Sequence, residues 1–385
     1  EDISKELNFD VASALHFLHA PPVTTPLKEL IEGIHPAQKR LALEELIAHN
    51  LSLRKVRNNF QALQAPIIKN DSDKVVSFLQ SLPFKLTEAQ KKSIDDITSD
   101  LAGNRPMLRL IQGDVGSGKT LVAAVSALLA ITNKFQVAVM APTEILAEQH
   151  ARNFSNWLSP LGIKVGQLSG EVKGIDRKNI LEALKNSQLD IIIGTHALFQ
   201  KSVIFAKLGL VIVDEQHRFG VHQRLALTKK ASPYQAHQLV MTATPIPRTL
   251  TMLAYADLDC SVIDELPPGR QQIHTVLIEN GRRNKIITRV EAACKTGRQA
   301  YWVCTLIEES EVLEAEAAAQ TASSLQLKLP EVNIGLIHGQ LRQAEKKEIM
   351  SSFVSGEIDL LVSTTVIEVG VDVPNASLMI IENPE

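Results

Sequence analysis

Aromatic residues are scarce in this sequence, at 4% of 385 residues. A protein that binds single strands by base stacking needs an array of aromatic rings, so the composition argues against a broad stacking platform. An excess of positive charge is also missing, because 40 Lys and Arg residues are set against 43 Asp and Glu residues, for a net charge of −3. Any contact with nucleic acid must therefore come from local patches and oriented backbone N–H groups.

Cysteine is rare and long apolar runs are lacking. The cysteines Cys260, Cys294 and Cys304 do not have the spacing of a metal site and cannot pair completely, which predicts a reducing, cytoplasmic compartment. The longest apolar run, 121–131, is far too short to cross a membrane, so no membrane contact is expected. The chain starts at Glu1 without a secretory signal and stops just after an apolar strand; we therefore expect an internal fragment of a longer polypeptide.

Length and apolar patterning predict three regions. Residues 1–82 are expected to be a helical linker region without chemical motifs, in which a long amphipathic helix starts near Pro36. One face of that helix is expected to pack on another element, because apolar residues recur at helical spacing: Leu43, Leu46, Ile47, Val56, Phe60 and Leu63. Its basic side chains favour a solvated face, with contact to a DNA backbone as the alternative.

Residues 83–266 and 267–385 are each expected to form an α/β lobe, with a parallel sheet covered by helices on both faces. The segment Pro267-Pro268-Gly269-Arg270 is predicted to link them. The expected strands are 107–111, 136–140, 190–193, 208–213 and 238–241 in the first lobe, and 300–304, 332–337, 360–363 and 378–381 in the second. The second lobe looks like a degenerate, C-terminally truncated copy of the first.

The strongest motif follows the strand 107–111 and precedes the helix 121–131. It reads G-x-x-x-x-G-K-T, and its members are Gly113, Asp114, Val115, Gly116, Ser117, Gly118, Lys119 and Thr120. The glycines let backbone N–H groups approach a triphosphate, the lysine adds a charge for the β- and γ-phosphates, and the threonine hydroxyl suits Mg²⁺. The pattern predicts a site for ATP with Mg²⁺, against a Gly-rich turn that matches by chance.

A second segment, 84–90, comes just before the motif strand. Thr87 is expected to cap the helix that follows. Gln90 then lies one turn into the helix, where its amide can donate to and accept from an adenine edge, although a capping role is the simpler alternative. Phe84 and Gln90 are therefore predicted on the base side of the nucleotide.

Two carboxylates end the apolar strand 208–213. Asp214 is predicted to hold Mg²⁺ together with Thr120, and Glu215 to orient the attacking water. His217 either relays the state of the γ-phosphate or is a packed histidine. The hydroxyls of Thr242 and Thr244, at another strand end, are predicted to couple phosphate state to the second lobe, with a strand-to-turn cap as the alternative.

Small residues and hydroxyls at the remaining strand ends suit nucleic-acid phosphates without net positive charge. The predicted contacts are Pro142, Thr143, Gly194, Thr195 and His196 in the first lobe, and His338, Gly339, Thr364 and Thr365 in the second. Gly370 is predicted to allow close approach, and Asp372 to accept from the nucleotide's ribose. Glycine turns and helix caps are the alternatives.

The ordered set of these motifs resembles the superfamily 2 helicases and translocases. The strings 214–224, 242–249, 301–310 and 365–376 resemble the bacterial branched-DNA helicases of the RecG family, as do His35-Pro36-Ala37-Gln38 and 43–46. The resemblance covers nearly the whole chain. It implies two tandem RecA-like lobes preceded by a helical segment, and ATP-driven translocation on duplex DNA at stalled forks and Holliday junctions, in recombination and repair.

The resemblance also implies partners, and the sequence departs from the family's pattern at two points. The partners are branched double-stranded DNA and, as a further candidate, single-stranded-DNA-binding protein; the chain is expected to be a monomer. The family's wedge, an OB-fold that splits the fork, is absent apart from its trailing linker, and so is the Gln/Arg-rich box that supplies a transition-state arginine. A fragment that binds ATP, hydrolyses it poorly and does not remodel forks is therefore expected.

Other functions remain open. Within the superfamily, the chain could be a transcription-repair-coupling-type duplex DNA translocase or an RNA helicase, although the string 214–224 favours the RecG family. A small-molecule kinase or switch GTPase would also use the phosphate loop, but the second strand-helix repeat and Gln90 count against it. A nucleotide-gated nucleic-acid-binding scaffold without catalysis is the last alternative.

Overall fold

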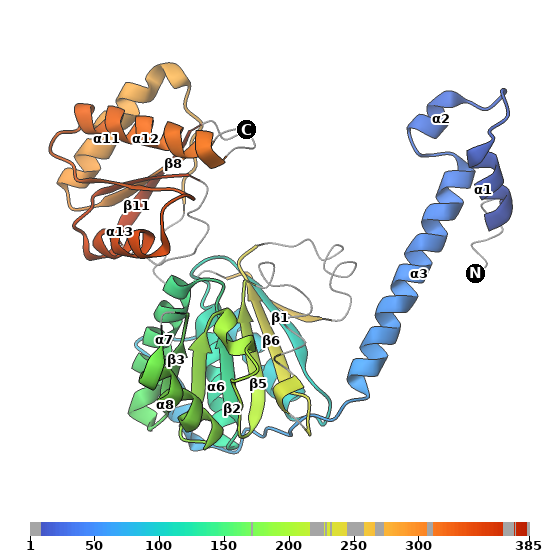
Figure 1. The fold of residues 1–385 in the computed structure, drawn as a ribbon, viewed down its shortest axis with the longest axis horizontal. Coiled ribbons are helices and arrows are strands. Elements are labelled where there is room, and N and C mark those ends of the chain that lie inside the picture. Colours follow the sequence, from blue (N-terminus) through green and yellow to red (C-terminus); the bar gives the residue numbers. More distant parts are fainter. Residues whose placement is uncertain are drawn as a thin grey trace. The chain divides into compact units, whose positions relative to one another are not determined.

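The structure is a computed structural model that describes residues 9–170, 172–215, 227, 229–231, 233–244, 258–265, 273–305, 311–364, 373 and 375–382. The chain divides into two compact units: Glu1–Met140 with Trp157–Pro267, and Ala141–Asn156 with Pro268–Glu385. Figure 1 shows the elements of each unit. No helix in the part of the chain that the structure describes is long and apolar enough to cross a bilayer.

Three helices open the chain: α1 (Val11–His19), α2 (Leu27–Ile31) and α3 (Pro36–Gln61). Proline suits the first turn of α3 because its missing N–H would have no helical partner there. The backbone N–H of Ala37 donates to Nδ1 of His35 at 3.2 Å, and the His35 ring stacks on Phe17 with 4.4 Å between centroids. These contacts give α3 a defined start.

The expected packing of one α3 face is wrong for three of the apolar residues. Leu46 and Ile47 are 57% and 43% exposed, Leu63 is 45% exposed and lies beyond the end of the helix, and Leu43 is half-buried. The helix α1 packs along α3, but helical spacing alone does not supply a second element for the rest of the stripe. The side chains of Val56 and Phe60 are outside the description.

The first unit is built on a seven-stranded, fully parallel sheet in the order β3-β4-β2-β5-β6-β1-β7. Its strands are β1 (Leu108–Gly113), β2 (Gln136–Met140), β3 (Val165–Leu168), β4 (Ile191–Gly194), β5 (Leu208–Asp214), β6 (His237–Thr242) and β7 (Asp259–Ile263). Strands β2, β4, β5 and β6 are buried along their whole length, which explains their almost continuous apolar sequence.

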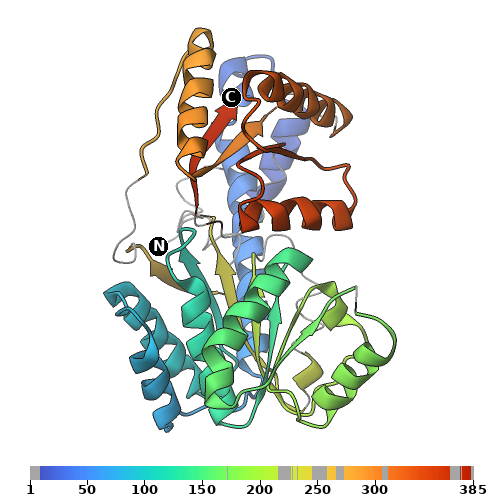
Figure 2. The ribbon, with the colours of Figure 1, turned by 90° about the vertical axis from the view of Figure 1, so that its left-hand side faces the viewer.

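Helices cover this sheet: α4 (Asp73–Ser81), α5 (Glu88–Leu101), α6 (Lys119–Thr132) and α8 (Gly174–Lys185), with short 3-10 turns η2 (Ser159–Leu161), η3 (His196–Phe199) and η5 (Lys229–Ala231). Most of the helix α7 (Glu144–Leu158) lies in the segment 141–156, which belongs to the second unit. Helix α6 crosses the centre of the sheet and contacts β1, β2 and β5. Helix α5 packs on α6 and on the edge strand β7, and Figure 2 shows it in teal at that side of the sheet.

The second unit contains a four-stranded parallel sheet in the order β11-β8-β10-β9. The strands are β8 (Gln299–Cys304), β9 (Ile334–Ile337), β10 (Leu360–Ser363) and β11 (Ala376–Glu382), and the helical elements are η6 (Asn280–Arg282), α11 (Arg283–Lys295), α12 (Glu311–Lys328) and α13 (Gln343–Ser355). Alternate residues of β8 face opposite cores: Trp302 packs with α11 and α12, and Tyr301 with α13. Figure 1 shows these helices on the two faces of the sheet. The predicted pair of parallel-sheet α/β lobes is confirmed.

In both sheets, a buried glutamine at the first residue of a central strand hydrogen-bonds to neighbouring segments. In the first unit, the side chain of Gln136 donates to the carbonyl oxygens of Leu184 and Leu189 at 2.8 and 2.9 Å, and accepts the N–H groups of Ala206 and Lys207. One buried amide therefore joins the end of α8, the start of β4 and the start of β5.

Gln299 has the same place in the second unit, at the first residue of β8. Its side-chain nitrogen donates to the carbonyls of Phe353 and Ile358, which flank the end of α13. Its side-chain oxygen is buried and has no partner among the residues that the structure describes. The shared contacts agree with the prediction that the second lobe resembles a degenerate copy of the first.

Candidate functional site

The sequence motifs of the first unit follow strands that run in one direction. The motif 113–120 follows β1, and the carboxylates of Asp214 and Glu215 follow β5. Thr242 ends β6, and Gly194 ends β4. Because all these strands are parallel, their carboxyl ends lie along one edge of the sheet, where ligands bind in open α/β folds. The expectation that these motifs gather at one edge is confirmed.

At Gly113 and Gly118, the loop 113–118 leaves no room for a side chain. A Cβ on Gly113 would lie 2.5 Å from Oγ of Ser117 and 3.0 Å from the carbonyl oxygen of Ile263. Gly118 has φ +92°, and a Cβ there would lie 2.3 Å from Nε2 of Gln90. Glycine alone fits both conditions at Gly118, since other residues rarely adopt such a backbone and would collide with the amide.

The start of α6 fits an anion. Gly118 is its N-cap residue and provides no side-chain cap, so the first N–H groups of the helix have no side-chain acceptor from the cap position. Asp114, Val115 and Gly116 are exposed on the loop, and Thr120 is half-buried at the second position of α6. A backbone cradle with uncapped donors is what a triphosphate requires.

Lys119 is already held by the loop. Its Nζ donates to the carbonyl oxygens of Gly113 and Asp114 at 2.7 and 2.9 Å. These bonds keep the ammonium beside the glycines, within the segment predicted to bind phosphate. The lysine therefore needs only a local rearrangement to reach a bound anion.

Gln90 serves both the helix and the loop. It forms a capping box with Thr87: the Thr87 hydroxyl accepts the N–H of Gln90, and Oε1 of Gln90 accepts the N–H of Thr87 at 3.1 Å. Its Nε2 donates to the carbonyl of Ser117 at 2.8 Å. The predicted cap at Thr87 is confirmed. An amide has two protons and about two acceptor positions, so one of each is not used in these bonds, while Gln90 itself is buried, with 3% of its surface exposed.

The adenine-reading role of Gln90 stays a prediction, and so does that of Phe84. The two contacts of Gln90 fix which way its amide points, because exchanging oxygen and nitrogen would break both of them. The Phe84 side chain is 48% exposed and available for contact with a base.

Asp214 and Glu215 differ in how they are held. Asp214 is buried, with 8% of its surface exposed, and its Oδ1 accepts the N–H of Glu215 at 3.1 Å. Glu215 has φ +47°, a left-handed backbone in which a non-glycine residue is strained. Its N–H donates to the carbonyl of Met241 on the neighbouring strand β6. Strain of this kind at a strand end often marks a functional residue.

The Glu215 carboxylate also reaches the end of β6. Oε2 accepts the hydroxyl of Thr242, and Oε1 accepts the N–H of Ala243, both at 3.3 Å. The N–H of Thr244 donates to the Thr242 hydroxyl at 3.2 Å. This bond is typical of a strand-to-turn cap, the alternative to a coupling role for these threonines. The predicted water-orienting residue is therefore in direct contact with Thr242, one of the two predicted coupling residues.

Magnesium ligation by Thr120 and Asp214 stays a prediction. Within the described ranges, no group of three or more His, Cys, Asp or Glu side chains could hold a metal ion by itself. One hydroxyl and one carboxylate fit Mg²⁺ in this setting, because this ion usually takes few protein ligands together with substrate phosphates and water.

The predicted phosphate contacts of lobe 1 follow two other strands. After β2, Oγ1 of Thr143 accepts the N–H of Leu146 at 3.4 Å, a contact typical of a helix cap, and Pro142 is half-buried. After β4, Thr195 is 8% exposed and has no side-chain cap bond, and His196 is exposed. A Cβ on Gly194 would lie 2.1 Å from the carbonyl oxygen of Leu168, so this glycine is required by strand packing.

In the second unit, His338 and Gly339 follow β9. Nδ1 of His338 and Oγ1 of Thr364 are buried and have no hydrogen-bond partner within the described part of the chain. Lys346 donates to the carbonyl oxygen of Gly339 at 2.7 Å. Buried polar atoms without partners are costly, and a ligand group would relieve them. His217, Thr365, Gly370 and Asp372 lie outside the described residues.

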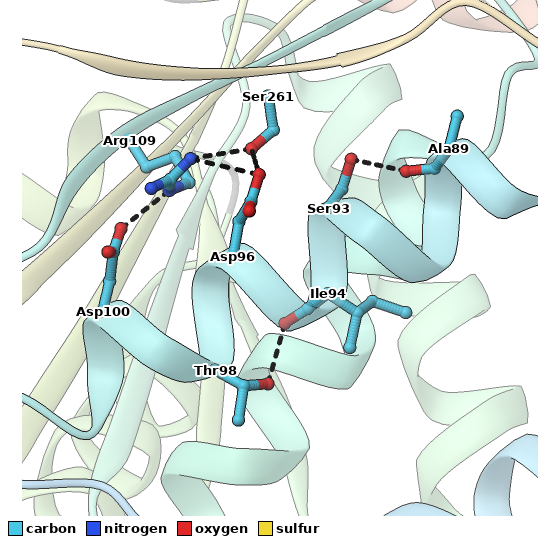
Figure 3. A network of polar contacts seen from close by, with 8 residues as sticks. All are labelled: Ala89, Ser93, Ile94, Asp96, Thr98, Asp100, Arg109 and Ser261. Atoms are coloured by element: carbon cyan, nitrogen blue, oxygen red, sulfur yellow. Dashed lines mark hydrogen bonds and ion pairs between the residues drawn. The ribbon is translucent and has the colours of Figure 1, made fainter.

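A polar cluster outside the sequence motifs joins β1, α5 and β7 (Figure 3). Arg109 on β1 contacts Asp96 and Asp100 of α5 and Ser261 of β7. The available signal was a single arginine inside the apolar strand 107–111, preceded by two aspartates spaced four residues apart on a predicted helix. We call these four residues the Arg109 cluster.

Two family models match the chain. The model described as DEAD/DEAH box helicase matches residues 87–253, and the model described as helicase conserved C-terminal domain matches residues 282–385. The first range contains the loop 113–120 and the carboxylates of β5. The second contains the four-stranded sheet.

Individual relatives extend the match to nearly the whole chain. The ATP-dependent DNA helicase RecG of Escherichia coli (strain K12) is 61% identical over 376 residues, which are 97% of this chain and 54% of that protein. RecG of Thermotoga maritima is 44% identical over 384 residues, which are 48% of its length. A solved structure described as RecG bound to a three-way DNA junction has a TM-score of 0.81 and 40% identity, and covers 97% of this chain and 48% of that one. The chain thus spans about half the length of these relatives, and it belongs to the RecG family of superfamily 2 helicases.

Proposed function

We propose that this chain is the ATP-hydrolysing motor part of a DNA helicase that acts on branched DNA, at stalled forks and Holliday junctions, in recombination and repair. The observation that carries the proposal is the loop 113–118 held between Gln90 and β7, with Glu215 in contact with the end of β6. A nucleotide site of this form, in a member of the RecG family, supports a motor rather than a kinase or a switch GTPase.

Each part of the site has a role in this proposal. Bound Mg²⁺ neutralises charge on the phosphates, and Thr120 and Asp214 are the residues that would hold it. Lys119 turns its ammonium from the loop carbonyls to the β- and γ-phosphates. Glu215 orients the attacking water and acts as its base.

Coupling to the second lobe is proposed to start at β6. The Glu215 carboxylate is bonded to Thr242 and Ala243, so a shift of Glu215 toward water or phosphate changes the bonds at the end of β6. His217, which is outside the described residues, is either a relay in this step or a packed histidine. Gly370 and Asp372 would contact the nucleotide from the second lobe.

The proposed nucleic-acid contacts are backbone amides and hydroxyls rather than a basic surface. They follow strand ends in both lobes, at Pro142–Thr143, 194–196, 338–339 and 364–365. The RecG structure that matches this chain is described as bound to a three-way DNA junction. Branched double-stranded DNA is therefore the proposed substrate, and single-stranded-DNA-binding protein is a proposed further partner of a monomeric, cytoplasmic enzyme.

We further propose that these 385 residues alone bind ATP but turn it over slowly. The family resemblance assigns the transition-state arginine to a Gln/Arg-rich box, which this sequence does not contain. Loss of such an arginine typically lowers the rate by roughly a thousandfold or more.

Calorimetry with ADP and with a non-hydrolysable ATP analogue tests the nucleotide site. The chain should bind both, and Lys119→Ala should abolish binding while its circular dichroism spectrum is kept. Unchanged affinity in Lys119→Ala would rule out this site.

ATPase rates test substrate choice. They are measured with forked DNA, linear duplex and RNA, on this chain and on a full-length relative. RNA as the best activator would contradict a branched-DNA motor.

A further inference from the structure

We propose that the Arg109 cluster positions the nucleotide site: it fixes helix α5 on the sheet, and α5 in turn holds the phosphate loop through Gln90. The inference rests on the proposed nucleotide-binding function and adds residues that lie outside the sequence motifs. Arg109 and Ser261 would act through α5, without touching the nucleotide.

The cluster joins three elements at one point (Figure 3). Nε of Arg109, on β1, donates to Oδ2 of Asp100 at 2.7 Å, and its Nη1 lies 3.5 Å from Oδ2 of Asp96. The same Nη1 donates to Oγ of Ser261, on β7, at 2.8 Å. The Ser261 hydroxyl donates in turn to Oδ2 of Asp96 at 2.7 Å.

The side chains of the Arg109 cluster are partly shielded from solvent, so their ion pairs and hydrogen bonds can fix the orientation of α5. The Arg109 side chain is 12% exposed, and those of Asp96 and Asp100 are 35% and 26% exposed. Burial lowers the pKa of Arg109, but hydrogen bonding to Asp100 and the charges of Asp100, Asp96 and Asp259 outweigh this, so the pKa is raised. The guanidinium stays charged, and its planar fork accepts few alternative arrangements of the two carboxylates.

The apolar face of α5 would not fix its position alone. Ile94, Ile97 and Leu101 are buried against the core, but apolar contacts are non-directional and tolerate small shifts along or around a helix. Asp96 and Asp100 are four residues apart, so they lie on one side of the helix and face the same arginine. Their bonds therefore set both the rotation and the axial position of α5.

The contacts form a closed ring in which the loop is one member. Strand β1 runs from Arg109 to Gly113, where the phosphate loop begins. The carbonyl of Ser117, inside the loop, accepts from Gln90 on α5, and α5 returns to Arg109 through its two aspartates. A shift of α5 relative to β1 would break either the ion pairs or the Gln90 bond.

A second contact attaches the same helix to the end of β7. Oε2 of Glu265 accepts the N–H of Ala89, in the first turn of α5, at 3.3 Å. A carboxylate at a helix N-terminus is favourable because of the unpaired N–H groups and the helix dipole. The segment from Ser261 to Glu265 thus holds α5 at its middle and at its start, close to the boundary of the first unit at Pro267.

The test measures nucleotide affinity separately from stability. Arg109→Lys keeps the positive charge but loses the fork, and Ser261→Ala is a milder change that keeps both ion pairs. Gln136→Leu is the matched control, because it disrupts buried hydrogen bonds at the amino end of β2, away from the strand ends that carry the loop. ADP affinity is measured by calorimetry in the whole 385-residue chain, and unfolding by calorimetric melting.

We expect Arg109→Lys to weaken ADP binding about threefold to tenfold, as is usual for groups coupled through one network, and Ser261→Ala to weaken it less. Gln136→Leu should lower the melting temperature and leave ADP affinity within about twofold, as is usual for distant sites. If the cluster acts through Gln90, Arg109→Lys should have little further effect in a Gln90→Ala background.

Three results would overturn the proposal. The first is equal weakening by Arg109→Lys with and without Gln90→Ala. The second is normal ADP affinity in both cluster variants. The third is a loss of affinity in Gln136→Leu that matches its loss of stability. If the unaltered chain does not bind ADP, the proposed function fails as well. If it binds ADP and the cluster variants bind ADP with the same affinity, the proposed function stands and the positioning role is lost.

Hydrogen exchange gives a readout that needs no nucleotide. With the Arg109 cluster weakened, the amides of 113–118 should exchange faster than in the unaltered chain, and Gln136→Leu should not have this effect at equal stability. Equal protection of 113–118 in Arg109→Lys and the unaltered chain would contradict the positioning role. If Arg109→Lys does not fold, the same comparison is made with Ser261→Ala.

Discussion

Gly118 shows how one residue can carry two requirements. Its positive φ ends the phosphate loop, and its missing side chain lets Gln90 approach the backbone. The sequence motif predicted only that the loop glycines let backbone N–H groups approach phosphate, because a motif describes the loop and not the helix beside it. The need for space at Gln90 follows from the contact between α5 and the loop.

We expect Gly118→Ala to abolish measurable ADP binding. The Cβ would lie 2.3 Å from Nε2 of Gln90, so the amide must move away, and the left-handed backbone becomes strained by about 1–3 kcal/mol. Calorimetric titration with ADP checks the prediction. Gly162→Ala, which also has a positive φ but open space around its Cβ, is the control and should bind ADP normally.

His237 is a buried residue with a structural role, and it lies outside the sequence motifs. Its Nδ1 accepts the N–H of Met107 at 3.0 Å, and its Nε2 lies 2.7 Å from the carbonyl oxygen of Pro66. These contacts assign the neutral ring with its proton on Nε2. Burial lowers the pKa of His237 below its ordinary value of 6.5, despite the opposing effect of Pro66.

The pKa of His237 predicts a pH dependence of stability. As pH falls below 6.5, the unfolded state takes up a proton that the folded state refuses, so the free energy of unfolding decreases by at most about 1.4 kcal/mol per pH unit until the folded pKa is reached. Above pH 7 this contribution is constant. Urea unfolding at pH 7.5, 6.5 and 5.5 measures the slope, and the His237→Gln variant should show a shallower one. Equal slopes would assign the pH dependence to other groups.

The cysteines should differ in reactivity. Cys260 is exposed, whereas burial and, secondarily, the charge of Asp359 raise the pKa of Cys294 to about 11. Burial likewise raises the pKa of Cys304. Since the thiolate is the reactive form, a thiol reagent at pH 8 should label one cysteine quickly in the folded chain and three after denaturation. Peptide mapping that finds Cys294 labelled first would contradict this.

At the scale of elements, the sequence predicted the central strands of the seven-stranded sheet well and its two edge strands poorly. Strands β2, β5 and β6 each contain a short apolar run, because parallel strands covered on both faces need one. Strands β3 and β7 were not predicted. Only Leu168 is buried in β3, and the first two residues of β7 are exposed, so neither has a strong apolar pattern. Their pairing is decided by neighbouring strands.

Gln136 and Gln299 allow a matched comparison of the two sheets. Gln136→Leu would leave two carbonyls and two N–H groups without their buried partner and should cost about 2–4 kcal/mol. Gln299→Leu removes only the two donated bonds and should cost less, about 1–2 kcal/mol. Denaturant unfolding measures both, and a larger loss for Gln299→Leu would contradict the assigned contacts.

For the whole molecule, ADP should stabilise the unit that holds the loop. A ligand at about 100 times its dissociation constant adds about 2.7 kcal/mol to the state that binds it. Calorimetric melting with ADP should therefore raise the transition of the first unit most, and that of the second, which would contribute only Gly370 and Asp372, less. Lys119→Ala should remove the shift. A shift confined to the second unit would place the nucleotide site elsewhere.

Local chemistry in the sequence determined that this chain has two parallel-sheet lobes, where the nucleotide loop begins, and which strands end in carboxylates or hydroxyls. Such features depend on neighbouring residues, so a linear pattern carries them. The pairing of Glu215 with Thr242, the anchoring of the loop by Gln90 and the Arg109 cluster were decided only by the tertiary structure. Ser261 lies 152 residues from Arg109, and Glu265 lies 176 residues from Ala89. Contacts at such separations arise from strand order and helix packing, which no local pattern specifies.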